Sequence, residues 1–396
     1  MSLWDRLPRP IVGLSPMDGV TDAPFRGVVA RYGKPDVTFT EFTHVNDICR
    51  APDFVLDSLR YSDVERPIVA QIYGKEPEAF YVAAYVVGEL GFDGLDINMG
   101  CPSRNVAHSG SGAGLIRTPD LARQIVEAAR RGLEDWAGGA ELPVDRLRTG
   151  RADLIRRMNE ARCGGPTAAR RMLPLSIKTR LGYDSDVIDR WMACLLETKP
   201  AAITIHGRTL EQMYRGKADW QAIARAVTCA RGSETLVLGN GDIQSLSEAA
   251  TRIAETGVHG VLVGRGVLGE PWFFRELARG RAAWARGGDG PLGSNWNPPV
   301  SLATRFAVML DHARLFEETR GRARFPHIRK HLAWYCKGFP HAATMRARLV
   351  RASCPSDVEA IVQDFADCST VPIPERPPSQ SPGECAPTGA MVGSAD

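Results

Sequence analysis

Short apolar segments alternate with amphipathic segments over the first 280 residues, and this alternation restricts the fold more than any other feature of the chain. In chain order, the expected strands are residues 11–14, 37–40, 68–71, 94–97, 175–179, 202–205, 236–239 and 260–263. Helical patterns lie between them, for example over residues 76–90 and 118–131. Strands that alternate with helices form parallel sheets, and eight such units predict a (β/α)8 TIM barrel.

The remaining segments predict smaller units around this barrel. The barrel is expected over residues 1–280 with an insertion at 132–171, followed by a linker at 281–300, an all-helical domain at 301–368 and a disordered tail at 369–396. Gly, Pro and Asn are frequent in the linker, and Pro, Ser and Gly in the tail. Because the insertion joins a helix to the next strand, we expect it on the barrel face opposite the active site.

Composition limits the class of protein. A hydrophobic content of 44% in 396 residues is enough for one large core and a smaller second unit. No apolar run approaches the roughly 20 residues of a membrane helix, and the first ten residues lack the apolar stretch of a secretory signal. None of the nine cysteines is spaced as Cys-x-x-Cys, so neither a disulfide framework nor a metal site is indicated. We expect a cytoplasmic monomer with reduced thiols, no metal and no membrane association.

The net charge of +3, from 49 basic and 46 acidic residues, says little about partners, but its distribution says more. Arginines are dense over residues 146–171, and residues 320–351 hold nine basic residues and no acidic one. A dense cluster of one sign is the electrostatic footprint of a polyanion-binding surface. It is also what a solvated helix face looks like, and the residues alone leave both interpretations open.

Two glycine-containing loops follow the last two expected strands. Residues 239–242 read Gly-Asn-Gly-Asp, and residues 264–266 read Gly-Arg-Gly. Glycines let the backbone approach a ligand closely, and their N–H groups form an anion cradle. The loops after strands seven and eight are the usual phosphate site of this fold, and Arg265 adds a bidentate partner. These loops predict a phosphorylated cofactor.

Three other strand ends carry side chains that suit a polar ring. Lys178 lies in an otherwise apolar strand, where it either contacts an electron-rich ring or extends to solvent at the strand end. His206 is either a structural histidine or a ligand contact, and the neighbouring Arg208 favours a contact. Gln71 either caps its strand or hydrogen-bonds the edge of a heterocycle.

Cys101 lies where the alternating stretch from Gly94 ends at Asn98 and breaks at Gly100 and Pro102. A strand that stops there delivers the thiol to the first residues of a loop. As a nucleophile it would need a histidine partner, whereas a general acid needs only a proton and reach. An ordinary thiol pKa of about 8.5 keeps the proton at neutral pH. The alternative is a buried cysteine that only packs.

Together these motifs resemble the tRNA-dihydrouridine synthase family. The similarity runs from about Ile11 to Leu277 and continues more weakly to about Phe365. In chain order the matching segments are residues 15–22, 40–42, 71–74, 96–102, 176–182, 206–209, 214–220, 240–243, 264–266 and 271–272. Each one alone is weak, but their joint order over a whole barrel is highly specific.

The resemblance implies an FMN enzyme that reduces specific uridines in tRNA. NADPH (or NADH) would reduce FMN, the flavin would pass a hydride to C6 of the uracil ring, and Cys101 would protonate C5. The residues implied to contact the cofactor are Pro16, Met17, Asp18, Gln71, Lys178, His206, Asn240, Gly241, Asp242, Gly264 and Arg265. Those implied to contact the substrate are Asn98, Arg104 and Arg208. A folded RNA partner would make the basic residues of 320–351 phosphate contacts.

Two alternatives stay open. Another FMN barrel, such as a dihydroorotate dehydrogenase or an ene-reductase, would share the phosphate loops but needs no basic helical domain. A catalytically silent RNA-binding barrel would keep the fold, although the retained Cys101 and Lys178 argue against it. Arg104 stands where the family usually has lysine, and Ser15 replaces a commoner alanine. These departures bear on substrate position more than on the reaction.

Overall fold

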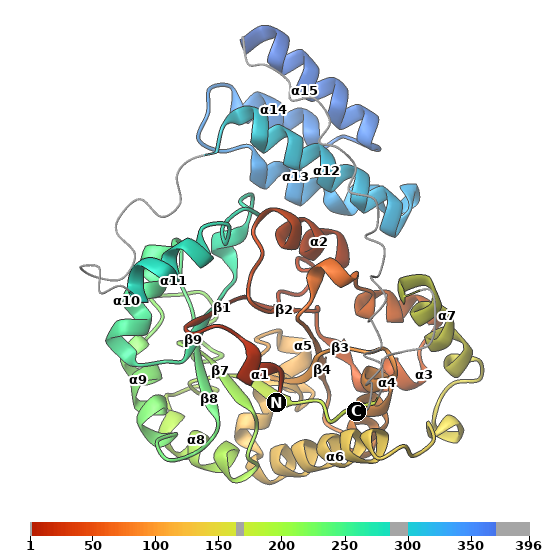
Figure 1. The fold of residues 1–396 in the computed structure, drawn as a ribbon, viewed down its shortest axis with the longest axis vertical. Coiled ribbons are helices and arrows are strands. Elements are labelled where there is room, and N and C mark those ends of the chain that lie inside the picture. Colours follow the sequence, from red (N-terminus) through yellow and green to blue (C-terminus); the bar gives the residue numbers. More distant parts are fainter. Residues whose placement is uncertain (1, 164–169, 286–299, 370–396) are drawn as a thin grey trace, which may run out of the picture.

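Eight parallel strands form a nearly closed barrel in the computed structural model, which describes residues 2–163, 170–285 and 300–369 (Figure 1). The strands are β1 Ile11–Leu14, β2 Thr38–Phe39, β4 Ile68–Tyr73, β5 Gly94–Met99, β6 Leu175–Arg180, β7 Ala202–His206, β8 Leu236–Asn240 and β9 Gly260–Val263. They pair in the order β1-β9-β8-β7-β6-β5-β4-β2. The Leu14 N–H donates to the Val37 carbonyl at 2.9 Å and brings β1 to β2. The predicted fold class is confirmed.

Strands β4 and β5 run two residues beyond their predicted ends, and β6, β7 and β8 run one residue beyond theirs. The extension of β5 matters for the site. The ladder between β5 and β6 pairs Asn98 with Lys178 and Met99 with Thr179, so Asn98 is a strand residue and not the first residue of a loop. The added strand β3 Thr43–His44 pairs with the end of β4. Sequence periodicity did not reveal β3, because two residues are too few to show an alternation.

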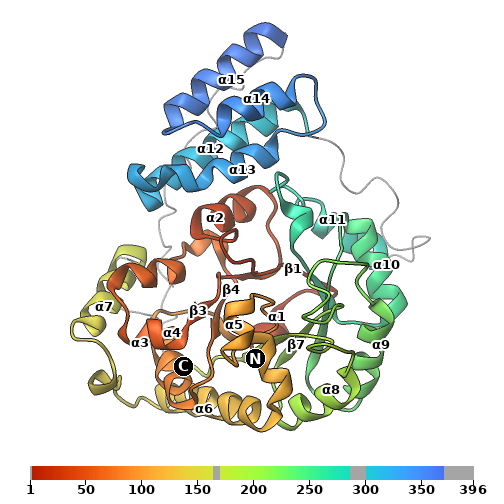
Figure 2. The same cartoon turned by 180° about the vertical axis from the view of Figure 1, so that it is seen from behind.

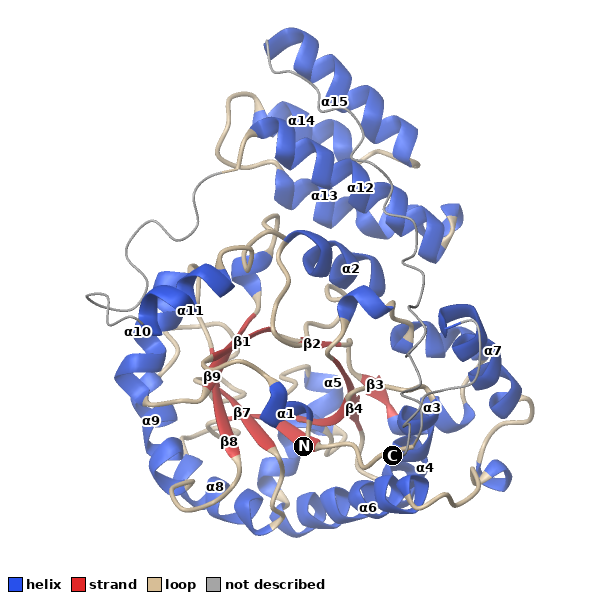
Figure 3. Cartoon of the chain, in the orientation of Figure 1, coloured by secondary structure: helices blue, strands red, loops and turns tan. Residues whose placement is uncertain are grey.

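Helices enclose the barrel wall, as the colouring by secondary structure in Figure 3 shows. Three of them begin at side-chain caps; for example, the Phe25 N–H donates to Asp22 (3.0 Å), and the Ala222 N–H donates to Asp219 (2.9 Å). The enclosing helices are α2 Ala23–Tyr32, α4 Pro77–Glu89, α6 Pro119–Ala137, α8 Ile188–Glu197, α9 Trp220–Cys229 and α10 Leu246–Thr256. Apolar residues of strands and helices form one core between the two layers.

The segment predicted as an insertion continues α6 to Ala137 and then forms α7 Arg151–Cys163, while residues 164–169 lie outside the described part. Helix α7 lies on the outside of the barrel, next to α3 Val45–Arg50 and α4 (Figure 1). Its Asn159 donates to the Glu89 carbonyl at 2.6 Å. Of the described residues in 132–171, none lines the cavity at the strand ends.

The arginines of this segment are held by acidic residues of the barrel surface. Arg146 pairs with Glu78 at 2.9 Å, and Arg171 pairs with Asp93 at 3.3 Å. Paired guanidinium groups contribute less to a free positive field than the sequence suggests. Of the two open interpretations of the 146–171 cluster, these pairs favour a solvated, ion-paired face.

Helices α12–α15, which we call the helical unit, pack on one side of the barrel against α2 (Figures 1 and 2). The unit has a core of its own, which contains Phe306, Leu332 and Val358 and extends to Val28 of α2. Its helices are α12 Leu302–Arg320, α13 Arg329–Tyr335, α14 Ala342–Leu349 and α15 Pro355–Ser369. Most of the predicted linker (286–299) and the predicted tail (370–396) lie outside the described residues.

Candidate active site

The carboxyl ends of the parallel strands surround a cavity of about 520 Å³. Parallel strands end at the same mouth of a barrel, which is where such folds place reacting groups. All residues implied to contact the cofactor line this cavity, as do Asn98 and Cys101. The cofactor residues are Pro16, Met17, Asp18, Gln71, Lys178, His206, Asn240, Gly241, Asp242, Gly264 and Arg265. The barrel therefore collects into one cavity the side chains that the sequence singled out.

The two glycine loops line the cavity in different ways. Gly241 has a φ of +137°, and a Cβ on it would come within 2.6 Å of Ala218 Cβ, so both backbone and packing require glycine there. A Cβ on Gly264 would meet its nearest neighbour, Met17 Sδ, at an ordinary 3.4 Å. The protein's own packing does not require glycine at 264. The space that a side chain would occupy is left to the cavity.

Asp242 lines the cavity, but its carboxylate already has four donors. Arg208 donates through two nitrogens at 3.0 and 2.6 Å, Arg265 donates at 3.0 Å, and the Ala218 N–H donates at 2.8 Å. Because these donors already occupy the carboxylate, it is suited to orienting Arg265 and not to binding a phosphate directly. Arg265 also lies over the ring of Tyr214, with its guanidinium carbon 5.0 Å from the ring centroid.

Arg208 does not reach the cavity lining, which differs from the expectation that it faces the substrate. Its side chain is buried, and besides Asp242 it donates to the Gly216 carbonyl at 2.7 Å. The bidentate pair with Asp242 holds the guanidinium under the cavity wall. Arg208 therefore fixes the loop after β7 to the loop after β8.

Strands β6 and β7 contribute a lysine, an arginine and a histidine whose charge states burial controls. Burial lowers the pKa of Lys178 to about 8 and the pKa of Arg180 to about 10. Burial, reinforced by the charges of Arg180 and Lys178, lowers the pKa of His206 well below its usual value. At neutral pH strand β6 therefore places two cations beside a neutral imidazole from β7.

Gln71 and Asn98 belong to a chain of buried hydrogen bonds. The Asn98 Nδ2 donates to Gln71 Oε1 at 3.0 Å, and the Gln71 Nε2 donates to Asp96 Oδ2 at 2.7 Å. Asp96 is fully buried, and burial raises its pKa to about 6. The sequence pattern does not mark Asp96, because it lies in mid-strand, where alternation indicates a position but not which way a side chain bonds.

Cys101 is 7% exposed and lies on the cavity wall. Its backbone N–H donates to Asn98 Oδ1 at 2.8 Å, which ties the turn back to the strand end. Burial raises the pKa of the thiol above its usual value, and Asp18 adds to this rise. A thiol with a raised pKa stays protonated at neutral pH, which a proton donor requires and a thiolate nucleophile does not.

Some lining residues were missed, and one predicted residue cannot be placed. Arg180 donates to the Gly100 carbonyl at 2.7 Å, and it follows Lys178 at the same strand end, which was the available signal. Phe42 and Tyr214 also line the cavity. Arg104 begins α5 Arg104–His108, but its side chain lies outside what the structure describes, so its substrate contact stays a prediction.

Four of the nine basic residues of 320–351 contact the barrel at what we call the junction. Arg324 pairs with Asp57 at 3.1 Å, Lys337 pairs with Glu270 at 3.0 Å, and Arg320 lies 3.8 Å from Glu41. Lys330 donates to the Gly19 carbonyl, in the loop that carries Asp18. Arg322 and Arg351 are exposed and have no side-chain partner among the described residues.

The described residues contain neither a metal-type cluster nor a membrane-type helix. No group of three or more His, Cys, Asp or Glu side chains is arranged to hold a metal ion in residues 2–163, 170–285 and 300–369. Within the same ranges, no helix has the length and apolar character needed to cross a membrane.

Comparison with known proteins agrees with the resemblance read from the motifs. The family model described as Dihydrouridine synthase (Dus) matches residues 13–143 and 165–369, so it includes the helical unit and omits the whole of α7. The Probable tRNA-dihydrouridine synthase 2 of Bacillus subtilis is 31% identical over 92% of this chain and 96% of its own length. The Probable tRNA-dihydrouridine synthase of Staphylococcus aureus is 30% identical over 92% and 95%.

Solved structures are more distant. DHODH from Eimeria tenella in complex with ferulenol is 17% identical and covers 59% of this chain and 63% of its own, with a TM-score of 0.39. A score of this size does not bear on the fold, which rests on the strand order. The family model spans most of the chain, and its motifs meet at one cavity. The chain belongs to the dihydrouridine synthase family of enzymes.

Proposed function

We propose that this chain reduces uridine to dihydrouridine in tRNA, with FMN as the bound cofactor, NADPH (or NADH) as the reductant and Cys101 as the proton donor. One observation carries the proposal: a protonated thiol, two cations and two phosphate-type glycine loops open onto a single cavity in a member of this family. The named relatives are probable tRNA-dihydrouridine synthases, which supports tRNA as the substrate.

The cavity fits a flavin mononucleotide. Its volume of about 520 Å³ lies in the range of roughly 300–1,000 Å³ that small-molecule sites occupy. Gly264 leaves space that its own neighbours do not need, and Arg265, held by Asp242, offers a guanidinium for a phosphate. Lys178 supplies a cation where an electron-rich ring would lie. When bound and reduced, FMN would supply the hydride that adds to C6 of the uracil ring.

The protein's own groups would manage the charge that this addition creates. Negative charge develops toward C5 and the ring oxygens of the uracil. Cys101 is protonated and would quench the charge at C5, and Lys178 and Arg180 would stabilise it electrostatically. His206 is held neutral, so it would act as a hydrogen-bonding group and not as a further cation. The target base would have to leave its stack to reach a cavity at the barrel mouth.

The helical unit would hold the rest of the tRNA. The other basic residues of the 320–351 stretch bond either to the barrel at the junction or to groups of the helical unit itself. The exposed Arg322 and Arg351 are therefore the members of this stretch best suited to contact phosphates. Tyr214 lines the cavity and is 59% exposed, so an extruded base would pass beside it. This contact would add stacking to the charge interactions.

The test is the variant Cys101→Ala, assayed on tRNA that lacks dihydrouridine. We expect it to bind FMN with the wild-type flavin absorbance and to form no dihydrouridine detectable by mass spectrometry of the tRNA. Cys194→Ala is the matched control, because Cys194 is also a buried cysteine but does not line the cavity. Full activity of Cys101→Ala would overturn the proton-donor assignment. Turnover of dihydroorotate or of an enone, but not of tRNA, would favour another FMN barrel.

A further inference from the structure

A carboxylate lies inside the barrel, behind the cavity lining. Asp96 on β5 is fully buried and does not line the cavity. Its Oδ2 accepts from Gln71 Nε2 at 2.7 Å, and its Oδ1 accepts from Ser176 Oγ at 2.6 Å. Burying a carboxylate costs free energy unless the group is well hydrogen-bonded, so the presence of Asp96 at a fully buried position needs a physical explanation.

The carboxylate determines which way two amides point. An ionised carboxylate only accepts hydrogen bonds, so Gln71 must turn its NH2 group toward Asp96. The Gln71 Oε1 then faces Asn98, whose Nδ2 donates to it at 3.0 Å. A reversed Gln71 amide would set its oxygen against the carboxylate, which is unfavourable. One charge therefore fixes the direction of both side chains.

The direction of the Asn98 amide in turn determines how the turn that carries the Cys101 thiol is hydrogen-bonded. With its NH2 committed to Gln71, Asn98 has its Oδ1 toward the turn, where it accepts from the Gly100 N–H at 3.0 Å and the Cys101 N–H at 2.8 Å. A reversed Asn98 amide would place N–H groups against N–H groups and release the turn. The order of bonds thus runs from Asp96 through Gln71 and Asn98 to the backbone of Cys101.

The cavity wall gains a consistent polarity from this arrangement. The amide nitrogens of Gln71 and Asn98 each carry two hydrogens, and one hydrogen of each forms the bonds described above. Gln71 and Asn98 both line the cavity, so the second hydrogens are the ones left for a ligand. The wall then offers N–H donors next to Lys178 and Arg180, which suits the carbonyl edge of an electron-rich ring.

We propose that Asp96 is a positioning residue that sets the amide directions of Gln71 and Asn98 and thereby holds the turn that presents Cys101 to the cavity. The inference rests on the proposed function for the role of Cys101. Asp96 acts through its neighbours and need not contact cofactor or substrate. Asp96 orients the side-chain amides of Gln71 and Asn98, and the negative charge of its carboxylate matters as well as its shape.

The experiment compares Asp96→Asn with Ser176→Ala. Asp96→Asn removes the charge that sets the Gln71 amide, because an asparagine offers N–H donors as well as an oxygen. Ser176→Ala removes one hydrogen bond to Asp96 and keeps the charge. The rate of iodoacetamide alkylation of Cys101, followed by mass spectrometry of its peptide, reports how the turn is held. We expect about a tenfold change in this rate for Asp96→Asn and less than about twofold for Ser176→Ala. Equal rates in the two variants would overturn the proposal.

A second measurement needs no variant and covers the case in which Asp96→Asn does not fold. The side-chain amide resonances of Gln71 and Asn98, in protein labelled at Gln and Asn, are followed against pH. Because the pKa of Asp96 is raised to about 6, both amides should shift together with a midpoint near pH 6. A role in packing alone predicts no such shared midpoint, and its absence would contradict the proposal. Neither readout requires tRNA or turnover, so failure here leaves the proposed function intact.

Discussion

Cations are used differently in two neighbouring regions of the molecule, the cavity and the junction. At the cavity, Lys178 and Arg180 face the space that a ligand would fill, and burial lowers the pKa of each. At the junction, Arg324 and Lys337 are bound to barrel carboxylates. Among the described residues, Lys178 and Arg180 thus have no ion-paired carboxylate and keep their charge for a ligand, whereas the cations of the junction hold two units together. The density of basic residues in the sequence does not distinguish a cation that faces a ligand from one that joins two units. The groups that each side chain contacts in the structure do distinguish them.

The largest expected effect comes from removing a cavity cation. Lys178→Met should lower the single-turnover rate of uridine reduction by about 10²- to 10³-fold, because it removes a preorganised charge beside developing negative charge. Because the pKa of Lys178 is about 8, its charge is lost as pH rises through 8, and the wild-type rate should fall there too. Lys337→Met is the control at the junction and should change the rate less than about twofold with saturating tRNA. Similar losses in both variants would contradict the distinction between the regions.

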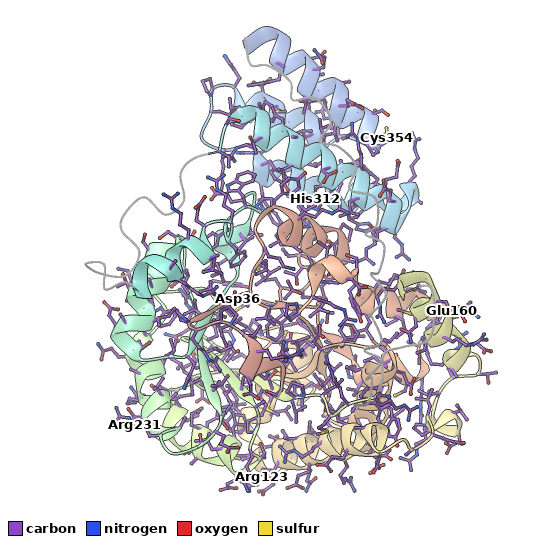
Figure 4. The ribbon with its side chains drawn as sticks, viewed as in Figure 1. Asp36, Arg123, Glu160, Arg231, His312 and Cys354 are labelled. Atoms are coloured by element: carbon purple, nitrogen blue, oxygen red, sulfur yellow. The ribbon has the colours of Figure 1, made fainter. Side chains whose placement is uncertain are left out.

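The next effect is on stability and belongs to the junction. Figure 4 labels His312, which lies where the helical unit meets the barrel. His312 and His331 are buried in contact with Phe25 of α2. Burial lowers the pKa of His312 to about 3 and that of His331 well below its usual value. The folded state therefore binds fewer protons than the unfolded state below pH about 6.5. Stability is present above that pH and falls below it, by up to about 1.4 kcal/mol per pH unit for each histidine.

The measurement is the midpoint of urea unfolding between about pH 7 and 5. His312→Phe should reduce the pH slope, because a phenyl ring cannot take up a proton, and Phe is close to imidazole in shape. His327→Phe is the matched control, since His327 is exposed. An unchanged slope in His312→Phe would show that the buried imidazoles do not set the acid sensitivity of this region.

The smallest effect separates RNA contacts from junction contacts within the helical unit. The double variant Arg322→Ala/Arg351→Ala should reduce the slope of log Kd for tRNA against log salt by about two, because each arginine would neutralise one phosphate. Arg324→Ala/Arg329→Ala should leave the slope unchanged, because Arg324 is paired with Asp57 and Arg329 donates to the Ala352 carbonyl. The reverse pattern would mean that these bonded cations, and not Arg322 and Arg351, are the ones that contact tRNA.

Most of the fold followed from the sequence, since eight short apolar segments in a βα alternation leave few other arrangements. The exceptions have physical causes. Strand β3 is too short to show a pattern, and Asn98 lies in the ladder because its neighbour Lys178 continues β6 beside it. The outline of the cavity was also predictable, because residues at the strand ends of a parallel barrel converge.

The bonds inside the site were not predictable from the sequence. Arg208 and Asp242 lie on different strand ends, and nothing in either loop indicated that they bind each other. Asp96 lies in mid-strand, where its importance depends on Gln71 from the neighbouring strand. The use of Arg324 at the junction depends on Asp57, far away in the chain. Pairings of this kind are decided by packing, which composition and periodicity do not encode.

The most direct test of the account is a single turnover of the Cys101→Ala variant without oxygen. The variant, loaded with FMN and reduced by NADPH, is mixed with tRNA that lacks dihydrouridine, and flavin absorbance and dihydrouridine are followed together. We predict that the absorbance stays that of the reduced flavin and that no dihydrouridine forms, while Cys194→Ala behaves as the wild type. Flavin reoxidation with formation of dihydrouridine at the wild-type rate would contradict the assignment of Cys101 as the proton donor.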